Sequence, residues 1–235
     1  VVEWNGVLFL VTRRPPGSTP SPNTTLFRSD SPVNTQSNSI ADLAAAAAAA
    51  ATALTSERYT LLGTSFGAHV ALWQAIQSPD QVEALVLISP PVIQPLGVPD
   101  SAPTQNVHEL MFAHLENARK HATLPQGIFA KESDLTSRRG SGVHDGDAES
   151  RLGDIHCPTL AVFGQEDRLV SYEAARVHRE KTPNCHIALV HAARHCLIGE
   201  LPEALRNTLP ASSETQETLS VAHPTTTDGG PALQV

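Results

Sequence analysis

The sequence predicts an α/β domain with a mostly parallel sheet and helices on both of its faces. Short apolar runs typical of buried strands alternate with longer segments of helical propensity. A Gly-x-Ser-x-Gly stretch joins one of these strands to the helix that follows it. Acidic and histidine residues come directly after two later strands, at the edge where parallel sheets of this kind hold their functional sites.

The first 39 residues match this alternation poorly. Gly6–Thr12 is a short apolar run that predicts a buried strand. Arg13–Asn38 is rich in Pro, Ser, Thr and Asn, which predicts a loop or a disordered segment. Ile40–Leu54 is expected to form a helix, because alanine favours helix interiors and Ser39 is a suitable N-cap.

Regular alternation follows that helix and continues, with one interruption, to residue 209. The expected strands are Tyr59–Leu62, Ala84–Ser89, Thr159–Phe163 and His186–Val190, and the expected helices are Phe66–Ile76, Ser171–Lys181 and Pro202–Leu209. Residues 91–150 break the pattern, with helical pieces expected in Val107–His121 and a surface loop in Lys131–Ser150. Residues 210–235 are rich in Ser, Thr, Pro and Gly and predict a disordered tail.

Composition argues against several classes of protein. The formal net charge of -8 and the low aromatic content of 4% leave no basic footprint or stacking surface for nucleic acid. No apolar run approaches the roughly 18 residues that a membrane helix needs. Three cysteines without Cys-x-x-Cys spacing predict reduced thiols and a cytoplasmic location.

The sequence indicates neither a cofactor nor a metal ion. Glycine-rich phosphate-binding motifs are absent from it. The stretch His144–Asp147 has metal-ligand residue types but no second ligand group at a fixed spacing, so we expect it to be a solvated loop.

The stretch Gly63-Thr64-Ser65-Phe66-Gly67 is the most informative feature of the chain. It lies between a predicted strand and a predicted helix, where a sharp turn holds the serine oxygen clear of the backbone. Gly63 and Gly67 are required by so tight a turn, because side chains there would collide with neighbouring backbone. The start of the following helix directs its positive end toward Ser65.

Polar residues follow two of the later strands. Asp167 comes after the strand Thr159–Phe163, and His195 comes after the strand His186–Val190. With Ser65, the order along the chain is serine, then acid, then histidine, which differs from the orders in chymotrypsin-like and subtilisin-like proteases.

These segments together resemble the α/β-hydrolase family. The turn at Ser65 is followed by the small residue Ala68, as in the family. Ile155–Val170 resembles the acid segment, in which the aspartate stands three residues after a glycine. His195–Leu205 resembles the histidine loop, with Glu200 and Pro202 at the family's spacing. The resemblance covers residues 40–209 apart from the interruption.

The resemblance implies a serine-dependent hydrolase that acts on a small-molecule ester, or a similarly activated carbonyl compound, through an acyl-enzyme. Ser65 would be the nucleophile, His195 the general base and Asp167 the residue that orients the imidazole. The backbone N–H of Phe66 would be one oxyanion-hole donor. Residues 1–209 would form the hydrolase domain, with residues 91–150 as a short cap over the pocket.

Two rival residues are weighed against these assignments. Glu166 is an alternative acid, but it falls one residue short of the family's position. His191 is an alternative base, but its spacing from Glu200 does not fit the family, and we expect it to be structural.

The chain departs from the family in one respect. No His-Gly pair precedes Ser65, although in relatives the loop after such a pair supplies the second oxyanion donor. We therefore expect the chain to lack the first strands of the sheet and to have weak or no activity. The alternative function is a non-catalytic α/β-hydrolase-like fragment without the oxyanion loop.

Overall fold

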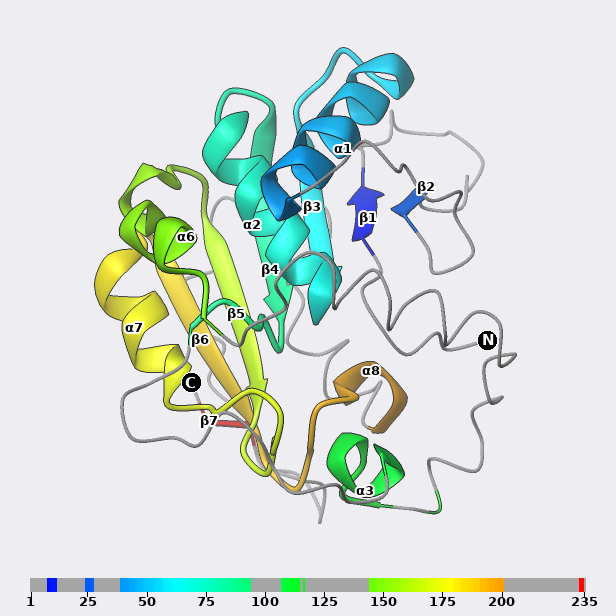
Figure 1. Cartoon of the computed structure of the whole chain (residues 1–235), viewed down its shortest axis with the longest axis vertical. Helices are drawn as coiled ribbons and strands as arrows, with labels where there is room; N and C mark the ends of the chain where they lie inside the picture. The colour runs from blue at the N-terminus through cyan, green and yellow to red at the C-terminus, as the bar shows by residue number, and fades with distance from the viewer. Residues whose placement is uncertain are drawn as a thin grey trace.

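A central parallel sheet organises the chain. The computed structural model describes residues 8–11, 24–27, 39–93, 107–114, 116, 144–200 and 233–234. Seven strands of this part form one sheet in the order β2-β1-β3-β4-β5-β6-β7 (Figure 1). The four central strands are mutually parallel: β3 (Tyr59–Thr64), β4 (Val82–Ile88), β5 (Thr159–Gly164) and β6 (Cys185–Val190). The predicted α/β class is thus confirmed for the centre of the fold.

Each outer strand pairs antiparallel with its neighbour. β1 (Leu8–Val11) pairs antiparallel with β3, and β2 (Thr24–Phe27) pairs antiparallel with β1. At the opposite edge, β7 (Leu233–Gln234) pairs antiparallel with β6. Four of the seven strands form the predicted parallel arrangement, and the three outer strands join it through antiparallel pairs.

Two of these strands correct the sequence predictions. Arg13–Asn38 was expected to contain no regular structure, but Thr24–Phe27 is a strand. Residues 210–235 were expected to be disordered, but Leu233–Gln234 pairs with the sheet. The physical reason is the same in both cases: a sheet edge presents unpaired N–H and C=O groups, which a short extended segment satisfies.

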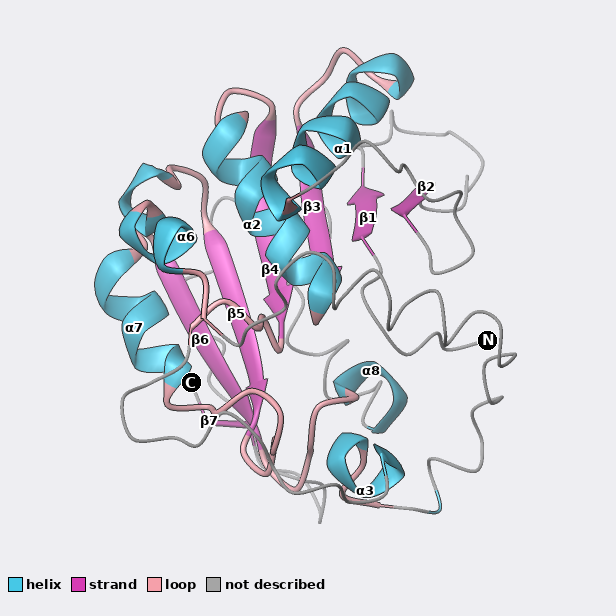
Figure 2. Ribbon diagram, viewed as in Figure 1, coloured by secondary structure: helices cyan, strands magenta, loops and turns pink. Residues whose placement is uncertain are grey.

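Side chains of the central strands alternate between two apolar clusters. Odd-numbered residues such as Leu85 and Phe163 face one cluster, and even-numbered residues such as Val86 and Val162 face the other. The first cluster includes residues of α1 (Ile40–Leu54), α2 (Phe66–Gln77), α6 (Gly146–Ser150) and α7 (Ala174–Lys181), and Figure 2 shows these helices together on one side of the sheet. Among the described residues, the second cluster contains one helix, α8 (Leu197–Glu200).

The helices match the predictions to differing degrees. α1 has the predicted bounds, and its N-cap is a capping box in which Ser39 Oγ accepts from the Asp42 N–H at 3.1 Å. α7 begins at Ala174, three residues after the predicted start. The predicted helix Pro202–Leu209 lies outside the described residues. No helix in the described part of the chain is long and apolar enough to cross a bilayer.

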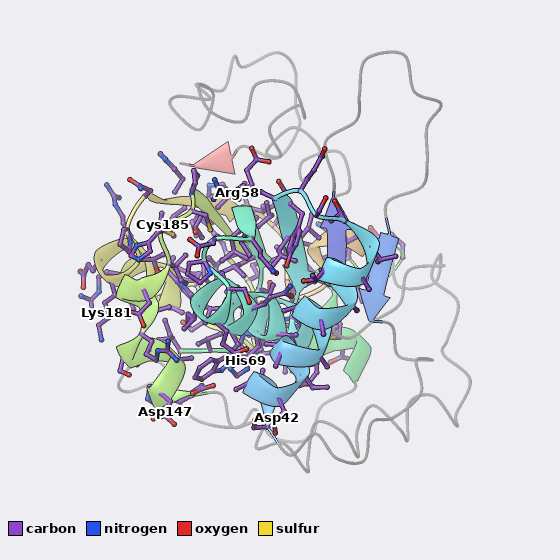
Figure 3. The ribbon with its side chains drawn as sticks, turned by 90° about the horizontal axis from the view of Figure 1, so that it is seen from above. Asp42, Arg58, His69, Asp147, Lys181 and Cys185 are labelled. Atoms are coloured by element: carbon purple, nitrogen blue, oxygen red, sulfur yellow. The ribbon has the colours of Figure 1, made fainter. Side chains whose placement is uncertain are left out.

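Asp145, near the end of the segment between β4 and β5, is bonded to α2. Asp145 Oδ2 accepts hydrogen bonds from His69 Nε2 at 2.7 Å and from Trp73 Nε1 at 2.8 Å, and both donors lie on α2. Figure 3 shows His69 on the helical side of the molecule, between α2 and α6. The hydrogen bond from His69 holds the pKa of Asp145 well below its usual range. The prediction of a solvated loop is therefore wrong for Asp145, which anchors the segment to α2.

His178 on α7 is a second buried polar residue, without such partners. Its ring is fully buried and lies against the Phe163 ring of β5, with the ring centroids 5.9 Å apart. Among the described residues, neither ring nitrogen has a hydrogen-bond partner. Burial lowers the pKa of His178 from 6.5 to about 4, although the negative charge of Glu149 acts in the opposite direction.

The His178→Leu variant is expected to weaken the dependence of stability on mild acid. The folded-state pKa of His178 is depressed, so its contribution is constant above pH 6.5 and is lost progressively as the pH falls toward 4, while the unfolded chain binds the proton. That loss amounts to roughly 3 kcal/mol over the interval, at about 1.4 kcal/mol per pH unit. Urea unfolding at several pH values measures it. His156 is exposed, so the control variant His156→Gln should show the wild-type slope of unfolding free energy against pH. Equal slopes in the wild type and both variants would contradict the prediction.

Candidate active site

Ser65 occupies a strained turn between β3 and α2. Its backbone has φ 50° and ψ -122°, a left-handed φ that few non-glycine residues adopt. The Ser65 N–H donates to the carbonyl oxygen of Ile88 on β4 at 2.8 Å, which fixes the turn to the neighbouring strand. Strain of this kind persists only where the surrounding structure holds it, and it concentrates at functional sites.

Gly63 allows this turn to close. A Cβ atom on Gly63 would lie 2.3 Å from the carbonyl oxygen of Gly67 and 2.6 Å from the Cα of Ala68. These are backbone atoms of α2, so no side-chain movement relieves the overlap. The first turn of α2 therefore lies directly against the end of β3, as the Gly-x-Ser-x-Gly pattern predicts.

The structure brings the three predicted side chains into one chain of hydrogen bonds. His195 Nε2 lies 2.8 Å from Ser65 Oγ, and His195 Nδ1 lies 2.9 Å from Asp167 Oδ2. With the imidazole proton on Nδ1, that nitrogen donates to Asp167 and Nε2 accepts from the serine hydroxyl. The side chains of His195 and Asp167 are 4% and 0% exposed, so this carboxylate and imidazole interact away from bulk water.

The loop after β5 orients the carboxylate of Asp167. Asp167 Oδ1 accepts the backbone N–H groups of Leu169 at 2.8 Å and Val170 at 2.9 Å. These two bonds occupy one carboxylate oxygen and leave the other directed at His195. Hydrogen bonds of this kind stabilise the ionised form of a carboxylate that is otherwise costly to bury.

The loop after β6 carries His195 across the end of β5. A Cβ atom on Gly164 would lie 2.4 Å from the carbonyl oxygen of Arg194 and 2.5 Å from that of Ala193. The Glu166 N–H also donates to the Ala193 carbonyl oxygen at 3.0 Å. The absence of a side chain at Gly164 thus permits the close approach that carries the imidazole toward β3.

The rival residues lie apart from this arrangement. Glu166 is exposed, whereas the carboxylate of Asp167 is enclosed. Ser65 Oγ contacts His195 rather than His191. Phe66 is the first residue of α2, where an N–H group has no partner within the helix, and this is the position predicted for an oxyanion donor. The chemical roles of these residues stay predictions.

Sequence reasoning missed the partners of the loop after β6, residues 191–196, which is called the histidine loop below. Glu200 was noted only for its spacing, yet it accepts the backbone N–H groups of Arg194 and His114, both at 2.7 Å. Arg194 was not considered, and its guanidinium donates to the Phe112 carbonyl oxygen at 3.0 Å. The spacing of Glu200 from His195 was the one available signal, because the groups that Glu200 and the Arg194 guanidinium contact are backbone N–H and C=O groups.

No described residues form an obvious metal or thiol centre. In this part of the chain, no three His, Cys, Asp or Glu side chains gather as a metal-binding group. Cys196 follows His195, but burial raises the pKa of its thiol to about 11, so the thiolate is disfavoured at neutral pH.

Comparison with known proteins identifies the family of the chain. Residues 13–208 match the profile of the Alpha/beta hydrolase family. The chain belongs to this family. The match extends across most of the sequence and includes Ser65, Asp167 and His195. No curated protein matches the chain.

Solved structures share the fold at low sequence identity. A variant of a meta-cleavage product hydrolase (CumD) has a TM-score of 0.61 at 17% identity, with 76% of this chain and 73% of that chain covered. A bacterial membrane phospholipase A has 0.54 at 19% identity, with 74% and 62% covered. Est816, described as an N-acyl homoserine lactone degrading enzyme, has 0.52 at 20% identity, with 74% and 76% covered. The chain thus spans less than two thirds of the phospholipase and about three quarters of the other two. At these identities the likeness shows the fold alone.

The Gly63→Ala variant is expected to destabilise the fold by at least about 2 kcal/mol, because overpacking against backbone leaves no side chain to move. Urea unfolding at neutral pH measures the change. Gly153→Ala is the matched control, since a Cβ atom there would meet nothing within 4 Å. A Gly63→Ala protein as stable as Gly153→Ala would contradict the described approach of α2 to β3.

Proposed function

We propose that the protein is a serine hydrolase that cleaves a carboxylic ester, or a similarly activated carbonyl compound, through an acyl-enzyme. The observation that supports this proposal is the hydrogen-bonded chain from Ser65 through His195 to Asp167, with its heavy-atom distances of 2.8 Å and 2.9 Å. Nucleophile, base and orienting acid within hydrogen-bond reach are the arrangement that activates a serine.

The reaction then proceeds in two halves. Ser65 Oγ forms a bond to the carbonyl carbon as His195 Nε2 takes its proton, and the carbonyl electron pair moves to the oxygen. When that pair returns, the bond to the leaving alcohol breaks and the proton on Nε2 passes to the alcohol. Water repeats the sequence on the acyl-enzyme, which releases the acid and restores Ser65. Asp167 stabilises the imidazolium formed in both halves.

The α2 terminus would stabilise the charge on the carbonyl oxygen. The Phe66 N–H lies in the first turn of α2, where the positive end of the helix dipole also favours an anion. Removing one such donor typically costs on the order of a hundredfold or more in turnover.

One observation favours the alternative, a non-catalytic relative. β1 occupies the place beside β3, but it runs antiparallel, with Leu8 opposite Gly63 and Val11 opposite Thr60. The carboxyl end of β1, at Val11, therefore lies at the end of the sheet opposite to Ser65. In relatives the second oxyanion donor comes from the loop after a strand that ends beside the serine.

The domain boundaries and the cellular location are also proposals. Residues 1–209 would form the hydrolase domain, and residues 91–150 would cap the pocket and select a small-molecule substrate. This segment carries apolar residues that would suit a modestly hydrophobic substrate, with helix core as the equal alternative. Val92, Ile93, Met111 and Phe112 are buried, Leu110 is half-buried, and Leu96 and Leu115 lie outside the described residues. A cytoplasmic location stays a prediction from cysteine usage.

The test is the rate at which the purified chain reacts with a fluorophosphonate probe. The wild type is expected to be labelled, because His195 removes the Ser65 proton during attack on phosphorus. Ser65→Ala should not be labelled, and His195→Ala should react on the order of a hundredfold or more slowly.

Ser150→Ala is the matched control, because that hydroxyl is exposed and donates to a nearby carbonyl. It should be labelled at the wild-type rate. A wild-type protein that is folded by circular dichroism and takes up no probe would favour the non-catalytic alternative instead.

A further inference from the structure

A short segment between β4 and β5 is bonded to the histidine loop on both sides of His195. This segment, residues 107–114, contains α3 (Val107–Met111). The Cys196 N–H donates to the Met111 carbonyl oxygen at 2.9 Å. The guanidinium Nη1 of Arg194 donates to the Phe112 carbonyl oxygen at 3.0 Å and also to that of Glu109. The residues before and after His195 are therefore both held by carbonyl groups of this segment.

Glu200 links the same two parts through its carboxylate. Its Oε2 accepts the Arg194 N–H and its Oε1 accepts the His114 N–H, both at 2.7 Å, and the residue is 4% exposed. A buried carboxylate is costly unless donors satisfy it, and charged acceptors form short, strong hydrogen bonds. The two N–H groups therefore bond to the same buried carboxylate, and breaking either bond costs free energy because it leaves a carboxylate oxygen without that donor.

The side chain of His114 adds a further bond to the loop. Its Nε2 lies 3.1 Å from the carbonyl oxygen of Ala192, to which an N–H on that nitrogen donates. Ala192 has a φ of 51°, in the left-handed region that is unfavourable for residues with a Cβ atom. A strained residue of this kind is retained where neighbouring contacts hold it, and His114 supplies one of them.

The opposite side of the loop rests on β5. The Arg194 and Ala193 carbonyl oxygens pack so closely on Gly164 that a Cβ atom there would lie 2.4–2.5 Å from them. The histidine loop is thus enclosed between the backbone of β5 and residues 107–114. Without the bonds to residues 107–114 the loop would be held mainly from the side of the sheet, and the position of His195 relative to Ser65 would be less fixed.

We infer that Glu200 is a positioning residue for His195, and that residues 107–114 hold the imidazole against Ser65 through it. The catalytic consequence rests on the proposed function, whereas the placement of the imidazole does not. A misplacement of about 1 Å at a reacting group costs on the order of a hundredfold in rate. The segment between β4 and β5 therefore contributes to the reactivity of the serine as well as to the rest of the fold.

The test uses the full chain with Glu200→Gln. Glutamine keeps one oxygen that accepts one N–H, but its amide nitrogen is a donor that faces the other N–H, so one of the two bonds is lost. We expect fluorophosphonate labelling to slow at least tenfold. We also expect the far-downfield proton NMR signal of His195 Nδ1–H, bonded to Asp167, to weaken or disappear; His195→Ala assigns that signal.

Glu180→Gln is the matched control, since Glu180 is an exposed residue that pairs with Arg176 on the same helix. It should keep both the wild-type labelling rate and the signal. Arg194→Met removes the guanidinium bonds and keeps the apolar stem, and it is expected to lower both readouts. If Glu200→Gln does not fold, the same two measurements on Arg194→Met test the inference.

The two readouts separate this inference from the proposed function. A wild-type protein that gives the imidazole signal but takes up no probe would refute the proposed function, and the signal in Glu200→Gln would still decide the inference. Labelling and signal in Glu200→Gln and Arg194→Met equal to those of Glu180→Gln would overturn the inference. A wild-type chain without the signal would overturn it as well.

Discussion

The arrangement of the site depends on how closely backbone approaches backbone at Gly63 and Gly164. At each glycine a Cβ atom would lie 2.3–2.4 Å from a carbonyl oxygen, far inside van der Waals contact. The first approach places α2 at the end of β3 and so holds Ser65 in its strained turn. The second places the histidine loop over the end of β5. β4 lies between these two strands, so both approaches are needed for His195 Nε2 to reach Ser65 Oγ at 2.8 Å.

The buried polar groups around the histidine loop then fix the orientation of the site residues, which apolar packing alone would not fix. Each carboxylate near the site is satisfied mainly by backbone N–H groups: Asp167 by two from its own loop, and Glu200 by one from each of the two parts that it links. Directional bonds to fixed donors set orientation, which apolar contact does not. Asp145, near the end of residues 91–150, likewise accepts directional hydrogen bonds, in this case from the side chains of His69 and Trp73. This segment is therefore tied both to the helix that follows the serine and to the loop that carries the histidine.

Much of this could be predicted from the sequence where a local pattern carries the information. The bounds of α1 and the start of α2 followed from alanine propensity, the Ser39 cap and the glycine pattern. The strand pattern indicated which stretches carry polar residues, and the resemblance to the family then selected Ser65, Asp167 and His195 within them. The direction of β1 could not be predicted, because strand pairing decides it and an apolar run has the same pattern in a parallel and in an antiparallel strand. The link between residues 107–114 and the histidine loop was also inaccessible, because most of its donors and acceptors are backbone groups, which every residue possesses.

Two properties that usually occur together are activation of the serine and stabilisation of the oxyanion, and the direction of β1 bears on the second alone. Activation of Ser65 requires the imidazole and the carboxylate, and both lie within hydrogen-bond reach. Turnover additionally requires donors for the oxyanion, and the Phe66 N–H at the start of α2 is the one proposed above. β1 begins beside Gly63 and ends beside Thr60, so its carboxyl end lies away from the serine. Probes that report attack by the serine and esters that report complete turnover therefore measure different parts of this site. A chain that reacts readily with a phosphonate but turns over an ester on the order of a hundredfold more slowly than expected would have an assembled nucleophile and an incomplete oxyanion hole.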